Sequence, residues 1–181
     1  MKRAVDLSIG LLGLLVFALI APVIALLIKL ESRGPVIFAQ TRVGRSERVF
    51  RCYKFRTMET GTAEVPTHQM TKADVTRVGR FLRATKLDEL PQLYNVVRGE
   101  MSLVGPRPCL PSQTPLIEAR RMRGVMHHLP GITGLAQVRG VDMSDHERLA
   151  KIDADYAGRT SIGLDFRILC ATIVGNRLIG V

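Results

Sequence analysis

The stretch LSIGLLGLLVFALIAPVIALLI, Leu7 to Ile28, runs for 22 residues without a charged side chain. At ~1.5 Å rise per residue, a straight helix of this length measures about 33 Å, enough to cross the hydrocarbon core of a bilayer. A buried helix of a soluble core and a cleaved signal peptide fit less well, because the run is long and no small-residue cleavage site follows it. Two alternatives remain, a transmembrane span and a helix that enters and leaves the membrane by the same face.

Two features favour the second alternative, a re-entrant helix. Pro22 lacks a backbone N–H and clashes with the preceding turn, so it should break or kink the helix. Basic residues flank the run on both sides, Lys2 and Arg3 before it and Lys29 and Arg33 after it. Cytoplasmic flanks attract Lys and Arg, so two basic flanks favour one shared side. We therefore expect a re-entrant membrane helix over residues 1–30, broken at Pro22, and a cytosolic, membrane-associated domain over residues 31–181.

The charge balance of the chain is strongly basic. Lys and Arg number 26 against 16 Asp and Glu, which gives a net charge of +10. Such a surface suits nucleic acid, an anionic membrane face or a phosphorylated substrate. Aromatic residues make up only 5% of the chain and Trp is absent, which argues against binding of single-stranded nucleic acid. The three cysteines are odd in number and far apart, so they predict neither a disulfide framework nor a zinc site.

The rest of the chain predicts an α+β fold that is mainly helical. Two runs rich in β-branched and aromatic residues, 36–43 and 49–55, surround turn residues 44–47 and predict a short β-hairpin. A polar loop is expected over residues 59–74. Helical spacing follows over residues 75–83, 112–123, 146–156 and 164–174. The last of these fits either a core helix or an amphipathic helix lying in the membrane interface.

Two adjacent carboxylates, Asp88 and Glu89, stand in the stretch KLDELPQLYN. A helix ending near Gly99 is predicted from one apolar face, formed by Leu90, Leu93, Tyr94 and Val97. Pro91 should then lie in the first turn, which puts the helix start at Asp88. Capping is the simpler interpretation, since acidic residues offset the positive end of a helix. The same geometry also suits chemistry, because a helix start attracts anions and a carboxylate is a ready nucleophile.

A stiff turn follows at GPRP, where Pro106 and Pro108 flank Arg107. Proline fixes its own φ and restricts the residue before it. Arg107 is therefore either an exposed residue of a plain turn or a pre-positioned guanidinium suited to bidentate recognition of phosphate.

Three motifs together carry a family resemblance: LDELPQLYNVVRGEMSLVGPRP at 87–108, YKFRTM at 53–58, and PGITGLAQVRG at 130–140. The chain resembles the small monotopic phosphoglycosyl transferases of the bacterial sugar transferase family. The resemblance implies transfer of a sugar 1-phosphate from a UDP-sugar to polyprenol (undecaprenyl) phosphate, with release of UMP. It also implies Mg²⁺, a covalent aspartyl-phosphosugar intermediate, and a location on the cytoplasmic face of the bacterial inner membrane. Such a reaction is an early membrane step of glycoconjugate or exopolysaccharide assembly.

The resemblance also implies roles for individual residues. Asp88 would be the nucleophile and Glu89 its partner, both placed to meet Mg²⁺. Ala21 and Pro22 would form the kink of the membrane helix, where relatives often have Ser-Pro.

Basic residues of the same motifs would hold the substrates. Arg83 and Arg107 would bind phosphates, and Arg56 occupies a basic position of YKFRTM near the site. Several relatives carry an arginine where this chain has Val141. Arg139, two residues earlier, is the candidate to replace it.

Membrane lipid is the further partner expected, and no nucleic acid. The alternative from another class is a membrane-anchored basic scaffold that binds nucleic acid or acidic lipid. The residues predict no particular sugar, pathway, lipid length or oligomeric state.

Overall fold

The computed structural model describes residues 1–59 and 75–174. Its α-helices are α1 (Lys2–Glu31), α2 (Arg77–Thr85), α3 (Gln92–Arg98), α4 (Thr114–Met122), α5 (Leu135–Val138), α6 (His146–Gly158) and α7 (Ile162–Val174). Its strands are β1 (Ile37–Val43), β2 (Val49–Phe55), β3 (Ser102–Val104) and β4 (Gly131–Thr133), and short 3-10 turns are η1 (Arg45–Glu47), η4 (Leu87–Glu89) and η5 (Val125–His127). The expected α+β, mainly helical class is confirmed. Apart from Glu59, the predicted loop 59–74 lies outside the described residues.

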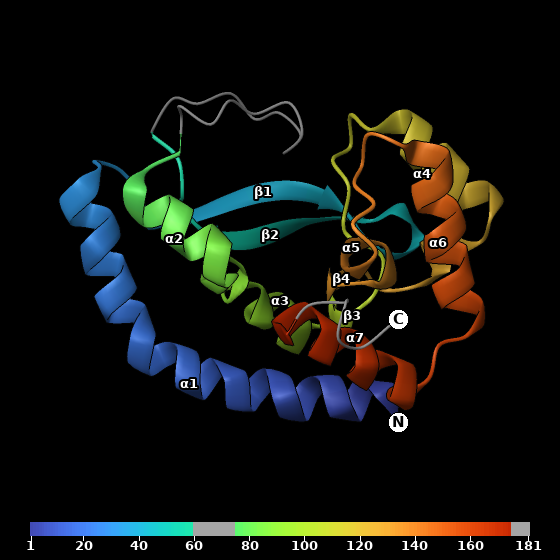
Figure 1. The fold of residues 1–181 in the computed structure, drawn as a ribbon, viewed down its shortest axis with the longest axis horizontal. Helices are drawn as coiled ribbons and strands as arrows, with labels where there is room; N and C mark the ends of the chain where they lie inside the picture. The colour runs from blue at the N-terminus through green and yellow to red at the C-terminus, as the bar shows by residue number, and fades with distance from the viewer. Residues whose placement is uncertain (60–74, 175–181) are drawn as a thin grey trace.

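Helix α1 is long and continuous, and it includes both Ala21 and Pro22. Figure 1 shows it running along one side of the molecule and changing direction on its way past α2. Pro22 is the proline inside α1, and proline is the usual cause of a sharp bend. The predicted break therefore takes the form of a bend, and the helical pattern continues through it.

The outer face of α1 is apolar and exposed, as its large side chains show: Leu11, Leu12, Leu15, Val16, Leu19, Val23, Leu26 and Leu30. Its length and composition would allow it to cross a membrane. The inner face packs closely on the rest of the chain. A Cβ at Gly13 would lie 2.8 Å from Leu93 of α3. Further along the helix, Ile24 and Ile28 are buried with Phe55 and Leu82.

Both ends of α1 are tied to the same body. Arg3 donates to two carbonyls at the C-terminal end of α3, at 2.6 and 3.0 Å. Buried Asp6 accepts from Ser102 Oγ of β3 at 2.8 Å. At the far end, Glu31 accepts from the first two backbone N–H groups of α2, beginning at Arg77, at 2.6 and 2.8 Å. The carboxylate thereby caps α2 and fixes the end of α1 to it.

The predicted hairpin is confirmed. Strands β1 and β2 pair antiparallel, with Val43 opposite Val49. The turn between them contains Ser46 and Glu47, both at positive φ. After the hairpin, α2 begins at N-cap Thr76, whose side chain accepts from Gly79 N. The helix spans 77–85, against 75–83 expected from sequence.

The two short strands β3 and β4 pair in parallel, with Ser102 opposite Gly131. Sequence reasoning did not predict this pair. The chains approach so closely that a Cβ at Gly131 would lie 2.1 Å from Gly105 N. Only glycine allows this contact, which brings the PGITG loop against the GPRP turn.

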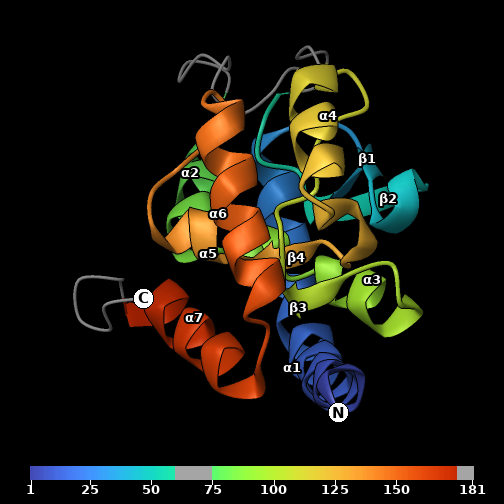
Figure 2. The same cartoon turned by 90° about the vertical axis from the view of Figure 1, so that its right-hand side faces the viewer.

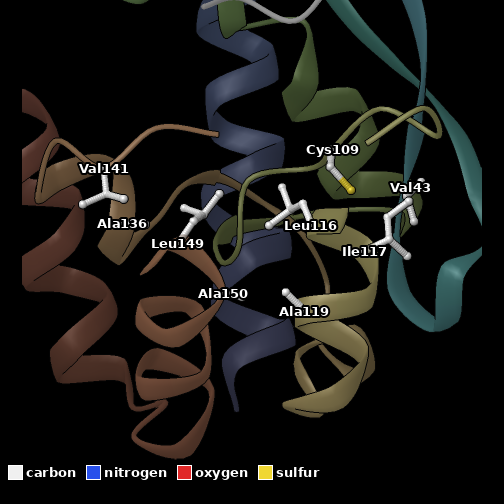
Figure 3. Close-up of a cluster of buried hydrophobic side chains, with 9 residues drawn as sticks. All are labelled: Val43, Cys109, Leu116, Ile117, Ala119, Ala136, Val141, Leu149 and Ala150. Carbon is white, nitrogen blue, oxygen red and sulfur yellow. The ribbon is translucent and has the colours of Figure 1, made fainter. Parts of the chain in front are cut away.

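Helices α4 and α6 pack side by side at one end of the molecule (Figure 2). Figure 3 shows the cluster between them, which includes Leu116 of α4 and Leu149 of α6. Cys109 and Val43 belong to the same cluster, so the hairpin end is joined to this helical pair. The helices expected over 112–123, 146–156 and 164–174 correspond to α4, α6 and α7.

Candidate active site

The carboxylate pair lies in the 3-10 turn η4, one turn before α3 begins. The predicted helix start at Asp88 is therefore wrong, because α3 starts at Gln92 with Pro91 as its N-cap. Pro91 has no N–H to bond the Leu87 carbonyl, so the chain closes a tighter i to i+3 bond from Leu90 N to Leu87 O at 3.2 Å. The turn is entered through Lys86, which has φ +61°.

The Asp88 carboxylate is only 8% exposed and makes no cap hydrogen bond. Among the described residues, none donates a hydrogen bond to it. Burial raises the pKa of the Asp88 carboxyl, and the charge of Glu89 raises it further. Three cations act in the opposite direction: Lys54, Arg83 and Arg107. Within the described residues, Asp88 is thus a largely buried residue whose carboxylate is surrounded by charge and receives no hydrogen bond, so capping is not its role.

The neighbouring carboxylate, Glu89, is tightly held. Its Oε1 accepts from Lys54 Nζ at 2.7 Å and from Arg107 Nη2 at 2.9 Å. Burial alone would raise the pKa of Glu89, but the charges of Arg107 and Lys54 outweigh it and lower the pKa to about 2. Both cations bind the same oxygen. Within the described part of the chain, no donor bonds Oε2, which leaves that oxygen for a ligand.

Lys54 is the site residue that sequence reasoning missed. It comes from β2 and lies inside YKFRTM, the motif in which the sequence predicted Arg56 as the site residue. Burial lowers the pKa of the Lys54 ammonium, while Glu89 acts to raise it. The sequence does show that Lys54 is a basic residue in a predicted strand. The alternation of side chains along a strand does not show which of its two faces packs against Asp88 and Glu89.

The segment Pro106–Arg107–Pro108 is held from behind by two other arginines. Arg42 Nη1 donates to the Pro108 carbonyl at 3.0 Å, and Arg120 Nη1 donates to the Arg107 carbonyl at 2.9 Å. Arg120 is itself fixed by Asp153, at 2.9 Å from Nε and 2.6 Å from Nη2. The predicted stiffness of this turn is therefore reinforced by side chains of β1 and α4, and it aims Arg107 at Glu89.

The other predicted arginines take three different places. Arg83 Nε donates to Thr57 Oγ1 at 2.9 Å, and its charge acts on Asp88. Arg56 is 6% exposed and donates through Nη2 to Ser32 O and Oγ, both at 2.8 Å, at the end of α1. Arg139 lies after α5, with Nη1 3.7 Å from Asp155 Oδ2. Asp88, Glu89, Arg83 and Arg107 thus come together, while the roles of Arg56 and Arg139 stay predictions.

Among the cavities formed by described residues, two border this site. One, here called the polar cavity, has about 500 Å³ and is bordered by Arg42, Lys86, Arg107, Gln113, Gln137 and Asp142, among others. The other, here called the apolar cavity, has about 480 Å³ and is bordered by Glu89, Leu90, Leu93, Leu103, Ile132 and Leu169, among others. Lys86 and Gln137 border both. One carboxylate site therefore has a cavity of mixed polar and apolar lining on the Arg107 side and a mainly apolar cavity on the Glu89 side.

Comparison with known proteins assigns this chain to a family. The bacterial sugar transferase family matches residues 1–176. The chain belongs to this family. This confirms the expectation from the motifs, and it covers the bent helix, the hairpin and the carboxylate turn alike.

Relatives of this chain come from several bacteria. The chain is 44% identical, over 95% of its length, to an undecaprenyl-phosphate glucose phosphotransferase of Komagataeibacter xylinus, of which it spans 35%. It is 39% identical to a UDP-glucose:undecaprenyl-phosphate glucose-1-phosphate transferase of Escherichia coli (strain K12), over 96% of the chain and 39% of the relative. With an exopolysaccharide production protein, PSS, of Rhizobium leguminosarum bv. phaseoli it shares 42% identity over 97% and 94% of the two chains. The chain thus spans well under half the length of the first two relatives and nearly all of the third.

Proposed function

We propose that this protein transfers a sugar 1-phosphate from a UDP-sugar to polyprenol phosphate, giving a polyprenyl-diphospho-sugar and UMP. The observation that carries the proposal is the contrast inside the pair, where Asp88 is an unbonded buried carboxylate and Glu89 is fixed by two cations. The printed names of the relatives from Komagataeibacter xylinus and Escherichia coli supply the substrate classes, an undecaprenyl phosphate and UDP-glucose. A scaffold protein has no need of such a pair.

Asp88 is the proposed nucleophile. In the first step its carboxylate oxygen bonds the sugar-bearing phosphorus, and the bond from that phosphorus to the bridging oxygen breaks. UMP leaves with the electron pair. In the second step an oxygen of the lipid phosphate attacks the same phosphorus, which frees the Asp88 carboxylate and forms the new diphosphate. One diphosphate replaces another, so catalysis consists mainly of positioning and charge neutralisation.

Glu89 is poorly suited to attack, because two cations hold its oxygen and its pKa is about 2. A carboxylate with a raised pKa and no hydrogen-bond donors is the more basic of the two and less stabilised as an anion. Asp88 has this environment. Arg107, Arg83 and Lys54 lie where they can balance the charge of a diphosphate.

Magnesium is the proposed cofactor, and the residues fit it. Mg²⁺ usually binds one or two carboxylates together with substrate phosphates and water. In the described part of the chain, no three His, Cys, Asp or Glu side chains form a metal cluster by themselves. Glu89 Oε2 and the Asp88 carboxylate would hold the ion, with the diphosphate completing its ligands. When bound, it would supply charge neutralisation on the transferred phosphate.

The proposed location is the cytoplasmic face of the bacterial inner membrane, with α1 re-entrant. The two hydrogen-bonded ends of α1 support this, because Arg3 and Glu31 both contact the same body. A full span would place its ends on opposite sides of a hydrocarbon core of about 30 Å. The exposed outer face of α1 would lie in lipid. Exposed Phe166 and Ile173 of α7 support a second, interfacial contact.

The test is release of UMP by the purified protein in lipid nanodiscs containing undecaprenyl phosphate, with a panel of UDP-sugars. Turnover should require both the lipid phosphate and Mg²⁺, and EDTA should abolish it. Sugar phosphate released into water without lipid would indicate a hydrolase instead. Salt-sensitive DNA binding without nucleotide turnover would favour the scaffold. For the membrane claim, cysteines introduced at exposed positions near Lys2 and near Ser32 should react from the same side of intact vesicles.

A further inference from the structure

The polar cavity is bordered by two amides that lack some hydrogen-bond partners among the described residues. Gln113 is 6% exposed, and its Oε1 accepts from Leu110 N at 2.9 Å while its Nε2 has no partner. Gln137 has the opposite need, because its Nε2 donates to Ile132 O at 3.4 Å and its Oε1 has no partner. One buried donor and one buried acceptor therefore border the same space. Buried polar groups are normally hydrogen-bonded, so each such group calls for an explanation.

The position of the cavity links these amides to the reaction. Arg107 borders the cavity and also binds Glu89, so a molecule with its phosphate beside the carboxylates can extend into this space. The volume of about 500 Å³ lies in the range of small-molecule sites. The prenyl end of the lipid suits the other space, whose border is formed by leucines such as Leu90 and Leu169. Of these two cavities, the polar cavity therefore suits the donor better.

We propose that Gln113 and Gln137 bind the uncharged, hydroxyl-bearing part of the sugar nucleotide in the polar cavity. An amide N–H and an amide oxygen together recognise a group that both accepts and donates, which a ring hydroxyl does. The donor offers such hydroxyls on its sugar and on its ribose. The inference rests on the proposed function, because it assigns a subsite to the same donor.

Binding to the inactive Asp88→Asn protein tests the proposal without turnover. Gln113→Leu and Gln137→Leu are introduced into that protein, and calorimetry measures the affinity for UDP-glucose, UDP and UMP. The matched control is Gln92→Leu. Gln92 is 2% exposed and also has an unpartnered Nε2, but it does not border the polar cavity. Thermal unfolding of each variant verifies that it is folded.

Each cavity variant should weaken UDP-glucose binding about tenfold or more, because removing an amide leaves a buried ligand hydroxyl unpaired. Gln92→Leu should leave it unchanged. Weaker binding of UDP-glucose with unchanged UDP and UMP would assign the amides to the sugar. Equal weakening of all three would assign them to the nucleoside. Folded cavity variants that bind UDP-glucose as tightly as the parent would overturn the inference while leaving the proposed function intact. Failure of the parent protein to bind any UDP-sugar would overturn both.

Discussion

Two carboxylates of this protein are buried against arginine, and their surroundings differ. Asp153 on α6 receives two hydrogen bonds from Arg120, and the two side chains are only 3% and 4% exposed. Glu89 is 12% exposed and receives one bond from Arg107 and one from Lys54. Burial raises the pKa of Asp153 in spite of its arginine, whereas the two cations at Glu89 lower its pKa to about 2.

The difference shows what a second cation and an adjacent carboxylate add. The Asp153 pair is closed, and its role is to hold the Arg107 carbonyl through Arg120. Two cations, Lys54 and Arg107, pair with the single negative charge of Glu89. Asp88 lies next to Glu89 and receives no hydrogen bond from any described residue. The closed pair, Arg120 and Asp153, stabilises the structure. The open cluster, Lys54, Asp88, Glu89 and Arg107, has positive charge available to bind a negatively charged substrate.

The largest effect is expected from Asp88→Asn. Turnover should fall by at least about 10³-fold, because the proposed nucleophile is removed while the shape is kept. The folded-state pKa of Asp88 is raised, so its stabilising contribution is present at low pH and is lost as the pH rises through that pKa. At neutral pH the buried anion therefore lowers stability, and the Asn variant should melt no lower than the parent.

The measurements for Asp88→Asn are UMP release in nanodiscs and thermal unfolding at pH 7. Near-parental turnover would remove Asp88 from the role of nucleophile. A large drop in melting temperature would contradict the description of Asp88 as a largely buried carboxylate that receives no hydrogen bond from the described residues.

The closed pair is broken by Arg120→Met. This change leaves Asp153 as a buried carboxylate without a cation, which should lower the free energy of unfolding by about 3–5 kcal/mol. The measurement is chemical denaturation in detergent. Adding Asp153→Leu should recover much of the loss, because an apolar pair tolerates burial. A loss below about 1 kcal/mol for the single variant, within the range of an exposed pair, would show that the pair is not closed.

Glu89→Gln tests the open cluster through the pH dependence of protein stability. The folded-state pKa of Glu89 is lowered from 4.5 to about 2, so its ionised form stabilises the fold above pH 4.5 and this contribution is lost as the pH falls toward 2. Parent and variant should therefore differ in the acid limb of a stability profile, by on the order of 3 kcal/mol. Parallel acid limbs for the two proteins would contradict the double pairing of Glu89.

The smallest effect is expected from Lys54→Met, which gives Glu89 a single cation, as Asp153 has. The pKa of Glu89 should rise, because burial then faces Arg107 alone. The acid limb of the stability profile of the Lys54→Met variant should shift to higher pH by about one pH unit, equivalent to about 1.4 kcal/mol. UMP release should also fall, because one cation near the diphosphate is lost. An unchanged acid limb would mean that Arg107 alone sets the pKa.

Much of the fold could be predicted from periodicity. The hairpin and helices α2, α4, α6 and α7 follow from local patterns of apolar residues, and the structure has them within a few residues of the expected bounds. The start of α3 was misplaced because Pro91 affects the bonding of the turn before it as well as its own position. The pair β3–β4 was missed because its three-residue strands carry too little pattern.

The residues of the candidate site also divide into those that local sequence predicts and those that it does not. Asp88, Glu89 and Arg107 could be found because they lie close in sequence within one motif. Lys54 could not be assigned, since its contact with Glu89 depends on how the hairpin packs, 35 residues away. Likewise, Lys2 and Arg3 were interpreted as basic flanks of a membrane helix. In the structure they bond Asp165 and the end of α3, contacts that no local pattern contains.

The hydrogen bonds at both ends of α1 tie this apolar helix to the rest of the described fold. Deleting it would uncover Phe55, Leu82, Leu93 and Val96, so a chain beginning after Glu31 should aggregate instead of yielding a soluble enzyme. The position of α1 relative to Asp88 is also fixed. Because Arg3 and Glu31 fix α1 to the body, the proposed membrane location would place Asp88 at one height above the bilayer, where a lipid phosphate would meet it at one depth.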